Sequence, residues 1–167
     1  MEDILGKTVG ALLLVGMIIF CTALFLNSAD SNIQTKLKDD SCEFIDSCRA
    51  KGCIEPAALS KFLSRIGDCG EFSATVYVDK KTSYYDEAAG KIIHSTSRID
   101  EEELLTAIYP ATGDDKPYNL STGDRISVEV KRTGAGFTAM FGLIGRGGKA
   151  GDLITEYSGL VLHDGRR

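Results

Sequence analysis

The hydrophobic residues of this chain begin with one long, uninterrupted run near the N-terminus. From Thr8 to Leu26, nineteen consecutive residues carry no charge, and most are Leu, Ile, Val, Phe, Ala or Gly. An α-helix rises about 1.5 Å per residue, so about 20 apolar residues are enough to cross the hydrocarbon core of a bilayer. The pattern therefore predicts a membrane-spanning helix, with residues 1–30 as a membrane anchor.

The run lacks the features of a cleavable signal peptide, which combines a basic start, a shorter apolar core and a small-residue cleavage site. Glu2 and Asp3 precede the run against a single Lys7, and no A-x-A-like site follows it. A buried helix that is apolar on every face would need a much larger protein around it. We therefore expect a retained, single-pass anchor.

The helical pattern continues beyond the apolar run. Residues 17–51 contain neither Gly nor Pro, so the helix can continue to about Lys51. Alternatively, it breaks within residues 27–32, where weak helix formers and capping residues gather, and restarts with a capping box formed by Ser31 and Gln34. The pattern leaves both possibilities open.

Residues 31–70 are expected to fold as a helical hairpin. Gly52 suits the position just past the end of the first helix, and Pro56 suits the first turn of a second helix that ends at Gly67. Two helices joined by so short a turn lie antiparallel. Their apolar positions repeat at helical spacing: Ile33, Leu37, Phe44, Ile45 and Cys48 in the first helix, and Leu59, Phe62, Leu63 and Ile66 in the second.

One of the five cysteines, Cys21, lies in the apolar run, and four lie in the hairpin: Cys42, Cys48, Cys53 and Cys69. An even number in a compact region favours two disulfides and an oxidising compartment over zinc, which would need closer cysteine spacing or a nearby His. Cys42 and Cys48 lie too far apart on one helix to bridge. We expect Cys42–Cys69 and Cys48–Cys53, with Cys42–Cys53 and Cys48–Cys69 as the alternative pairing and four unpaired thiols in a cytosolic domain as the remaining interpretation.

The cysteines also decide the expected orientation in the membrane. Basic residues give little guidance, because Lys7 lies on one side of the apolar run and Lys36 and Lys38 lie on the other, where acidic residues offset them. An oxidising compartment places the N-terminus inside the cell and the C-terminal domain outside the cytoplasm.

Residues 71–167 show the alternation of a half-buried antiparallel sheet. The expected strands are 71–79, 91–97, 125–132 and 154–163, with a hairpin turn at 86–90. A short helix is expected from Asp100, with Glu103 at its capping-box position and Leu104, Leu105 and Ile108 buried. Residues 111–120 are a polar loop, 137–144 a short helix or an exposed loop, and 145–151 a flexible Gly-rich segment. The fold class is α+β, with roughly four antiparallel strands after the N-terminal helices.

Charge and motifs exclude several function classes. The net charge of −5 and the absence of a basic cluster argue against nucleic acid. Residues 134–139 match G-x-G-x-x-A, but the preceding strand alternates, whereas a dinucleotide-binding strand is buried on both faces. Residues 145–151 do not match a phosphate-binding P-loop. His94 and His163 are isolated, so we expect no catalytic, metal or cofactor site and no enzymatic activity.

Several segments together resemble a known group of proteins. They are the start MEDILGK with its apolar run, Phe44-Ile45-Asp46, Arg49-x-x-Gly52-x-Ile54-x-Pro56, Leu120-Ser121-x-Gly123-Asp124, and the Gly-rich stretch before the last strand. The chain resembles small single-pass proteins of Gram-positive bacteria that are related to pilin-like components of tight-adherence (Tad) and type IV pilus systems. The resemblance implies a pilin-like, extracytoplasmic structural or assembly component that associates with itself or with partner subunits through its N-terminal helix, in the cell membrane or in a surface filament.

The chain also departs from type IV prepilins, which have a basic leader ending in Gly and a Glu at the fifth mature position. Cleavage after Gly6 would place Ala11 at that position, and the leader here is acidic. We therefore expect the N-terminus to be retained. Gly6, Gly10 and Gly16 are the candidate assembly face, because small residues allow helices in a membrane to approach closely. The alternative function is a membrane-tethered module that presents its sheet and loops to a ligand or partner.

Overall fold

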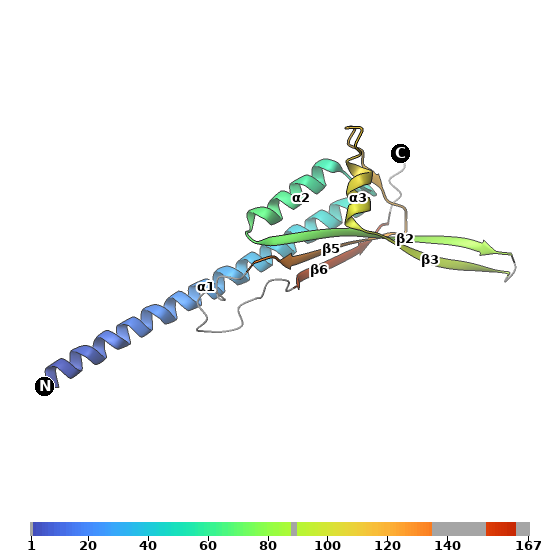
Figure 1. Cartoon of the computed structure of the whole chain (residues 1–167). Coiled ribbons are helices and arrows are strands. Elements are labelled where there is room, and N and C mark those ends of the chain that lie inside the picture. Colours follow the sequence, from blue (N-terminus) through green and yellow to red (C-terminus); the bar gives the residue numbers. More distant parts are fainter. Residues whose placement is uncertain (1, 88–89, 135–152, 163–167) are drawn as a thin grey trace.

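A computed structural model of the chain describes residues 2–87, 90–134 and 153–162. It has an α+β fold in which one long helix projects from a domain built on a four-stranded antiparallel sheet (Figure 1). The elements in chain order are α1 (Glu2–Lys51), β1 (Cys53–Ile54), α2 (Pro56–Asp68), β2 (Phe72–Asp86), β3 (Lys91–Ile99), α3 (Glu101–Ile108), β4 (Tyr118–Asn119), β5 (Arg125–Arg132) and β6 (Leu153–Leu160).

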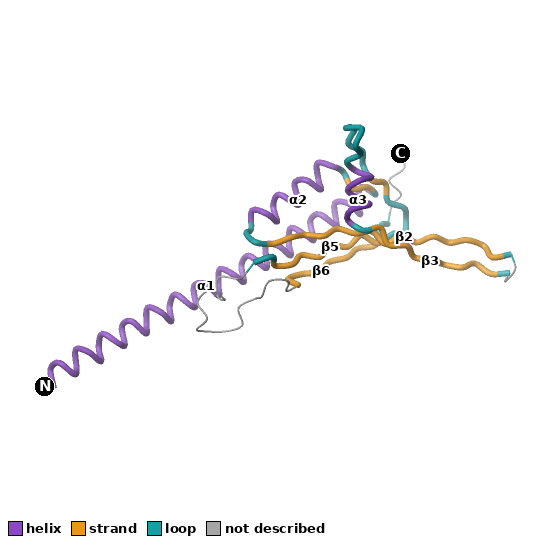
Figure 2. Tube along the Cα trace, in the orientation of Figure 1, coloured by secondary structure: helices purple, strands orange, loops and turns teal. Residues whose placement is uncertain are grey.

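Helix α1 runs without a break through residues 27–32, which resolves the two possibilities that the sequence left open (Figure 2). Asp30 accepts hydrogen bonds both from Gln34, one turn further along the helix (3.4 Å), and from Arg132 of β5 (2.7 Å). These contacts favour the helical conformation at residues whose own helix propensity is weak. The helix ends as expected at Gly52, whose φ of 67° lies in the left-handed region and whose N–H donates to Cys48 O (2.8 Å).

Helix α2 returns along α1 and completes the predicted hairpin. Pro56 lies in its first turn, and the rings of Phe44 and Phe62 stack between the two helices with centroids 4.5 Å apart. The buried positions of the hairpin join those of the sheet in one core, which includes Leu37, Ile45, Ile54, Leu59, Ile66, Val76, Val78, Leu104, Ile108, Leu120, Ile126, Val128 and Val130. The hairpin and the sheet are therefore stabilised by the same apolar packing.

The sheet has the order β3-β2-β5-β6, and all neighbouring strands are antiparallel. Strand β2 is longer than expected, because it continues beyond Asp79 through polar residues to Asp86. Its first half pairs with β5, from Phe72 opposite Arg132 to Asp79 opposite Arg125. Its second half pairs with β3, up to Asp86 opposite Lys91. β2 is therefore shared between the body of the sheet and a hairpin that extends past it.

We call this extension, residues 80–86 of β2 with residues 91–97 of β3, the arm. It projects from the end of the sheet that lies opposite the N-terminus of α1 (Figure 1). The alternation rule missed it, since 80–86 is polar on both faces and packs against no core. The arm gives the molecule two projections that point away from each other.

Two local predictions in the remaining elements were wrong. Asp100 occupies the N-cap of α3, but no side-chain capping hydrogen bond forms, and the bond from Leu104 N–H to Asp100 O (2.9 Å) closes the first turn without the predicted capping box. The expected loop 111–120 contains β4, which pairs with β1. Residues 137–144, 145–151 and His163 lie outside the described residues.

Candidate functional site

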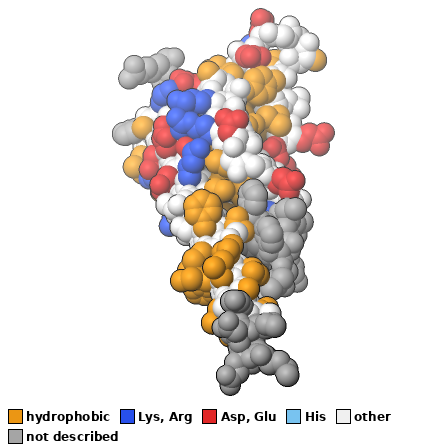
Figure 3. All heavy atoms as spheres, turned by 90° about the vertical axis from the view of Figure 1, so that its left-hand side faces the viewer, with side chains coloured by type: hydrophobic (Ala, Val, Ile, Leu, Met, Phe, Trp, Pro, Cys, Tyr) orange, Lys and Arg blue, Asp and Glu red, His pale blue; other side chains and the backbone are white. Residues whose placement is uncertain are grey.

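The N-terminal half of α1 presents large apolar side chains to its surroundings on every side. Leu12 and Phe25 are 72% and 73% exposed, and the other large hydrophobic residues between them are exposed as well. Figure 3 shows this apolar group of side chains on the face from which the helix projects. Soluble monomers rarely expose so large an apolar surface. Within the described part of the chain, α1 is a helix long and apolar enough to cross a membrane.

The polar groups of this segment fit apolar surroundings. The hydroxyl of Thr22 donates to Ile18 O (2.8 Å), one turn earlier in the same helix. A hydroxyl that bonds within its own helix leaves no donor unpaired in hydrocarbon. The segment from Val9 to Phe25 rises about 25 Å along the helix axis, close to the thickness of a bilayer core.

The three glycines predicted as an assembly face divide into two groups. Gly6 and Gly10 are four residues apart and lie on one side of a straight α-helix, whereas the six residues from Gly10 to Gly16 turn the helix by about 600°, which places Gly16 about 120° away. A side chain added at Gly10 or Gly16 would meet nothing within 4 Å. Gly10 and Gly16 therefore each allow close approach of a second helix, but the three glycines do not form one face.

An ion pair joins α1 to the sheet just beyond the apolar segment. Arg132 Nη2 lies 2.7 Å from Asp30 Oδ1, and the side chains are only 5% and 14% exposed. The Arg132 guanidinium also lies over the ring of Phe72, 5.0 Å from its centroid. Arg132 is the last residue of β5, so this pair fixes the end of the sheet to the point where α1 leaves the domain.

A second attachment holds the other end of α1 against β6. Arg49 donates from Nε to Leu160 O (2.7 Å) and from Nη1 to Asp46 Oδ1 (2.9 Å). The close approach requires Gly159, because a Cβ there would lie 2.3 Å from Arg49 Cδ. Asp30 and Arg49 therefore attach α1 to opposite ends of the sheet, and sequence reasoning identified neither contact, since both join residues about a hundred positions apart.

The predicted disulfides are not formed: Cys42, Cys48, Cys53 and Cys69 are all free thiols, as is Cys21. Cys42 is in hydrogen-bond contact with Tyr157 of β6, whereas Cys69 Sγ donates to Arg65 O of its own helix (3.2 Å). The two thiols therefore face different neighbours. Cys48 is buried in the core, and Cys53 lies in β1 opposite Asn119, so neither the expected pairing nor its alternative is present.

Cys48 is the thiol most strongly affected by its surroundings. Burial, reinforced by the nearby Cys53, raises the pKa of Cys48 from its ordinary value near 9.0 to about 12. Burial also raises the pKa of the more exposed Cys53. Because the thiolate is the reactive form, Cys48 behaves as a small apolar core residue rather than as a nucleophile or a metal ligand.

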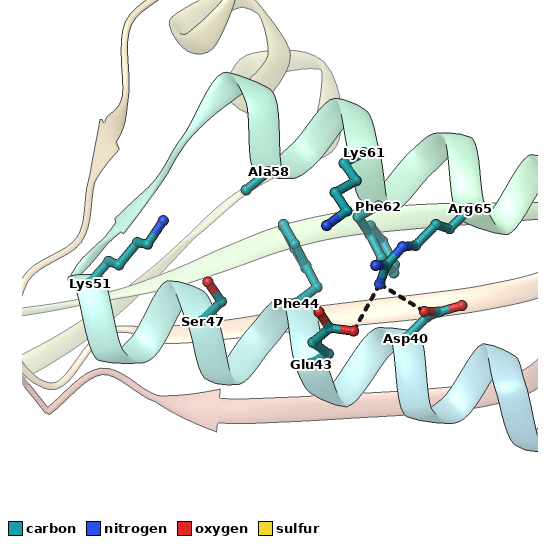
Figure 4. A pocket seen from close by; sticks show the side chains of 9 residues that line it. All are labelled: Asp40, Glu43, Phe44, Ser47, Lys51, Ala58, Lys61, Phe62 and Arg65. Atoms are coloured by element: carbon teal, nitrogen blue, oxygen red, sulfur yellow. Dashed lines mark hydrogen bonds and ion pairs between the residues drawn. The ribbon is translucent and has the colours of Figure 1, made fainter.

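A groove of about 200 Å³ runs between α1 and α2 (Figure 4). The stacked rings of Phe44 and Phe62 lie along it, and Arg65 of α2 reaches across to Asp40 (3.1 Å) and Glu43 (2.8 Å) of α1. The hydrogen bond with Glu43 raises the pKa of Arg65, whose charge is matched by these two carboxylates. The groove is therefore bridged by ion pairs between the helices.

The other residues of the groove do not converge on one point. Lys51 and Lys61 lie on different helices, and Lys51 Nζ is held 2.6 Å from Glu55. Two of the three basic side chains that line the groove, Lys51 and Arg65, are thus already paired with carboxylates. Among the described residues, no group of three His, Cys, Asp or Glu side chains is placed to bind a metal ion. His94 of β3 contacts Ser83 of β2 across the arm (2.7 Å), whereas the five cysteines lie in α1, in β1 and at the end of α2.

Comparison of the chain with protein-family models, with curated proteins and with solved structures finds no match.

Proposed function

We propose that the chain is a membrane-anchored, pilin-like structural or assembly component with its C-terminal domain outside the cytoplasm. The observation that carries this proposal is the continuity of α1, which combines an exposed apolar half with a half that forms part of the core. A long helix of this kind supports two tasks at once, because its first half suits a bilayer or other apolar helices while its second half holds the sheet domain.

The glycines of the apolar half support helix-mediated association. Gly10 and Gly16 are open to close approach by a second helix, and the apolar window around them is not buried within the described part of the chain. Without water between helices, small residues and van der Waals packing are what favour association in a membrane. We infer that this segment contacts lipid in the isolated protein and like helices in an assembly.

A membrane-tethered binding module is the second candidate function. The concave groove between α1 and α2 favours it, since ligand sites are usually concave. Arg65, Asp40 and Glu43 in this groove already pair with one another, which favours the structural role over ligand binding.

Cysteine cross-linking through α1 in native membranes tests the proposal. Single cysteines are placed at Gly10, Gly16 or Leu13 in a chain whose own cysteines are replaced by Ala. The yield of cross-linked oligomers should depend on which face of α1 carries the cysteine. Co-expression with the genes that neighbour its own, followed by imaging of the cell surface, tests incorporation into a filament. The binding module would be favoured if the protein resisted alkaline extraction but stayed monomeric, and if the soluble domain without its anchor bound the target.

A further inference from the structure

The arm is the part of the described sheet that lacks a core. Strand β5 reaches only to Arg125, opposite Asp79, so 80–86 of β2 pairs with β3 alone. Tyr85 and Ile92 face each other across the arm and are 63% and 62% exposed. A two-stranded hairpin by itself is marginally stable in water, and a third strand stabilises it. The arm is therefore a two-stranded sheet that a further strand would stabilise.

The two edges of the arm are not equally accessible. The Lys81 N–H points away from β3 and donates to Asp124 Oδ1 (3.1 Å), so a side chain beside β5 occupies the base of the β2 edge. On the other side, β3 is the last strand of the sheet within the described residues. The β3 edge is thus the longer one on which another strand can add.

Along a strand, the N–H and C=O groups of successive residues point alternately to the two edges, so the residues that point outward from β3 can be identified. Since Lys81 points away from β3, Thr82 points toward it, and its partner is Ser95. The residues on either side, His94 and Thr96, therefore direct their N–H and C=O groups outward. Residues 92–97, IIHSTS, contain no Pro, Gly, Lys, Arg, Asp or Glu, the residues with which exposed strands usually avoid edge-to-edge pairing.

The charges at the two ends of this edge differ in sign. Lys91 begins β3 at the tip of the arm, and Asp100 with Glu101, Glu102 and Glu103 follows its other end. Near the acidic end, Arg98 of β3 forms an ion pair with Asp79 of the neighbouring strand β2 (3.0 Å), and its guanidinium lies over the ring of Tyr77. An antiparallel copy of the edge would bring Lys91 beside Asp100 at both ends, whereas a parallel copy would bring like charges together.

We propose that the β3 edge is a self-association surface on which a second copy of the chain adds its own β3, antiparallel, to form a continuous four-stranded arm. A two-fold axis at Ser95 places Lys91 opposite Ile99 of the other copy, next to its Asp100, and places His94 opposite Thr96. These last two residues then exchange backbone hydrogen bonds through the groups that point outward. Each arm supplies the strand that the other lacks.

The two-fold axis stands perpendicular to the arm, so the bodies of the two copies lie at its opposite ends. Because α1 projects from the far end of each body, the N-terminal helices of the pair point in opposite directions (Figure 1). Pairing would therefore join copies in two facing membranes or in two separate assemblies. This last step rests on the proposed membrane anchoring, whereas the pairing itself does not.

A charge exchange between the two ends of the edge tests the pairing. Full-length Lys91→Glu and Asp100→Lys variants, each in detergent micelles, should stay monomeric by light scattering at concentrations where the wild type is dimeric. An equal mixture of the two should recover dimers, since both contacts are then of opposite charge again. Recovery in the mixture supports the proposal; a mixture that stays monomeric, or single variants that dimerise like the wild type, overturns it.

Two further variants test the register and the backbone. In a two-fold pair centred on Ser95, this residue faces its own copy at about 4.5 Å between Cα atoms, within disulfide reach. Ser95→Cys should therefore give linked dimers under mild oxidation at least tenfold faster than Ser97→Cys. Thr96→Pro removes an outward N–H and should abolish dimers, while Thr96→Ala keeps it and should retain them; equal behaviour within either pair overturns the proposal. The melting temperature of each variant reports whether the fold is intact.

Vesicles separate the pairing from the membrane orientation. Vesicles of neutral phospholipid that carry the full-length chain with its domain outside should cluster when the chain is wild type. Those that carry only Lys91→Glu should stay dispersed, and they should cluster when mixed with Asp100→Lys vesicles. Flotation of the vesicles reports insertion independently, so loss of the anchor is distinguished from loss of pairing. Dimers within single vesicles that never cluster them would contradict the opposed arrangement.

Discussion

Arg132 at the end of β5 and Asp30 in α1 form an ion pair that is almost completely buried, at 2.7 Å. The residues are 102 positions apart in sequence, and their contact closes the domain at the side where the apolar helix emerges. A buried charge without its partner is costly, so each residue constrains the other. The pair favours the helical conformation of α1 at residues whose own helix propensity is weak.

Loss of one partner of this buried ion pair should destabilise the protein more than loss of one partner of an exposed ion pair. Asp30→Ala leaves the Arg132 charge buried and is expected to lower the free energy of unfolding by about 3 kcal/mol. Asp46→Ala is the matched control, because it removes an ion pair of α1 whose carboxylate is largely exposed, and it should cost less than about 1 kcal/mol. Denaturant unfolding in micelles measures both. Equal losses would show that the buried pair has no special role.

The close approach of Arg49 to β6 should make Gly159 intolerant of a side chain. Gly159→Ala places a Cβ against Arg49 Cδ and 3.0 Å from Ile45 Cγ2, so it should destabilise the protein by about 1–2 kcal/mol. In an Arg49→Ala background, the same substitution should cost clearly less, because the obstructing atoms are gone. A double-mutant cycle in thermal unfolding checks this, and additive effects would contradict it.

Asp124 should stabilise the fold at the point where the arm leaves the sheet. Its buried carboxylate accepts from the N–H of Ser121 (2.8 Å) and from the N–H of Lys81 (3.1 Å). Asp124→Ala leaves two N–H groups without these acceptors and should cost about 2–3 kcal/mol, with faster amide hydrogen exchange at Lys81. Asp114→Ala, in an exposed loop, is the control and should leave exchange at Lys81 unchanged.

Cys48 should be the least reactive thiol of the domain. Because its pKa is raised to about 12, alkylation of the folded protein at pH 8 should modify Cys48 at least about tenfold more slowly than Cys69, as measured by mass spectrometry of peptides. The folded pKa lies above the ordinary value, so the neutral thiol stabilises the fold below about pH 9, and this stabilisation is lost as the pH rises toward 12. Cys48→Ala should therefore show a smaller fall in melting temperature across that range.

The sequence predicted the parts of the fold that depend on local pattern. The apolar run, the hairpin around Gly52 and the alternation in 71–79 and 125–132 all lie in elements of the expected type, and the α+β class is confirmed. The choice between a continuous and a broken α1 was not available from pattern, since it depends on a contact with Arg132, 102 positions further along the chain.

The arm and the cysteines show two other limits of local pattern. A strand that packs on no core has no reason to alternate, so residues 80–86 carried no strand signal. The disulfide prediction rested on how many cysteines lie close in sequence, whereas the direction of each thiol is set by neighbours such as Tyr157, which the chain reaches more than a hundred residues after Cys42. Contacts of this kind require the tertiary structure.

The unbroken path of α1 has a mechanical consequence. A helix of 50 residues extends about 75 Å and bends little where it contains neither Gly nor Pro, which holds from residue 17 to residue 51. Asp30 and Arg49 attach its second half to the sheet, so the first half is joined rigidly to the domain, without a hinge between them. A tilt or rotation of the apolar end is transmitted directly to the domain, and the tip of the arm, at the far end, moves through the widest arc.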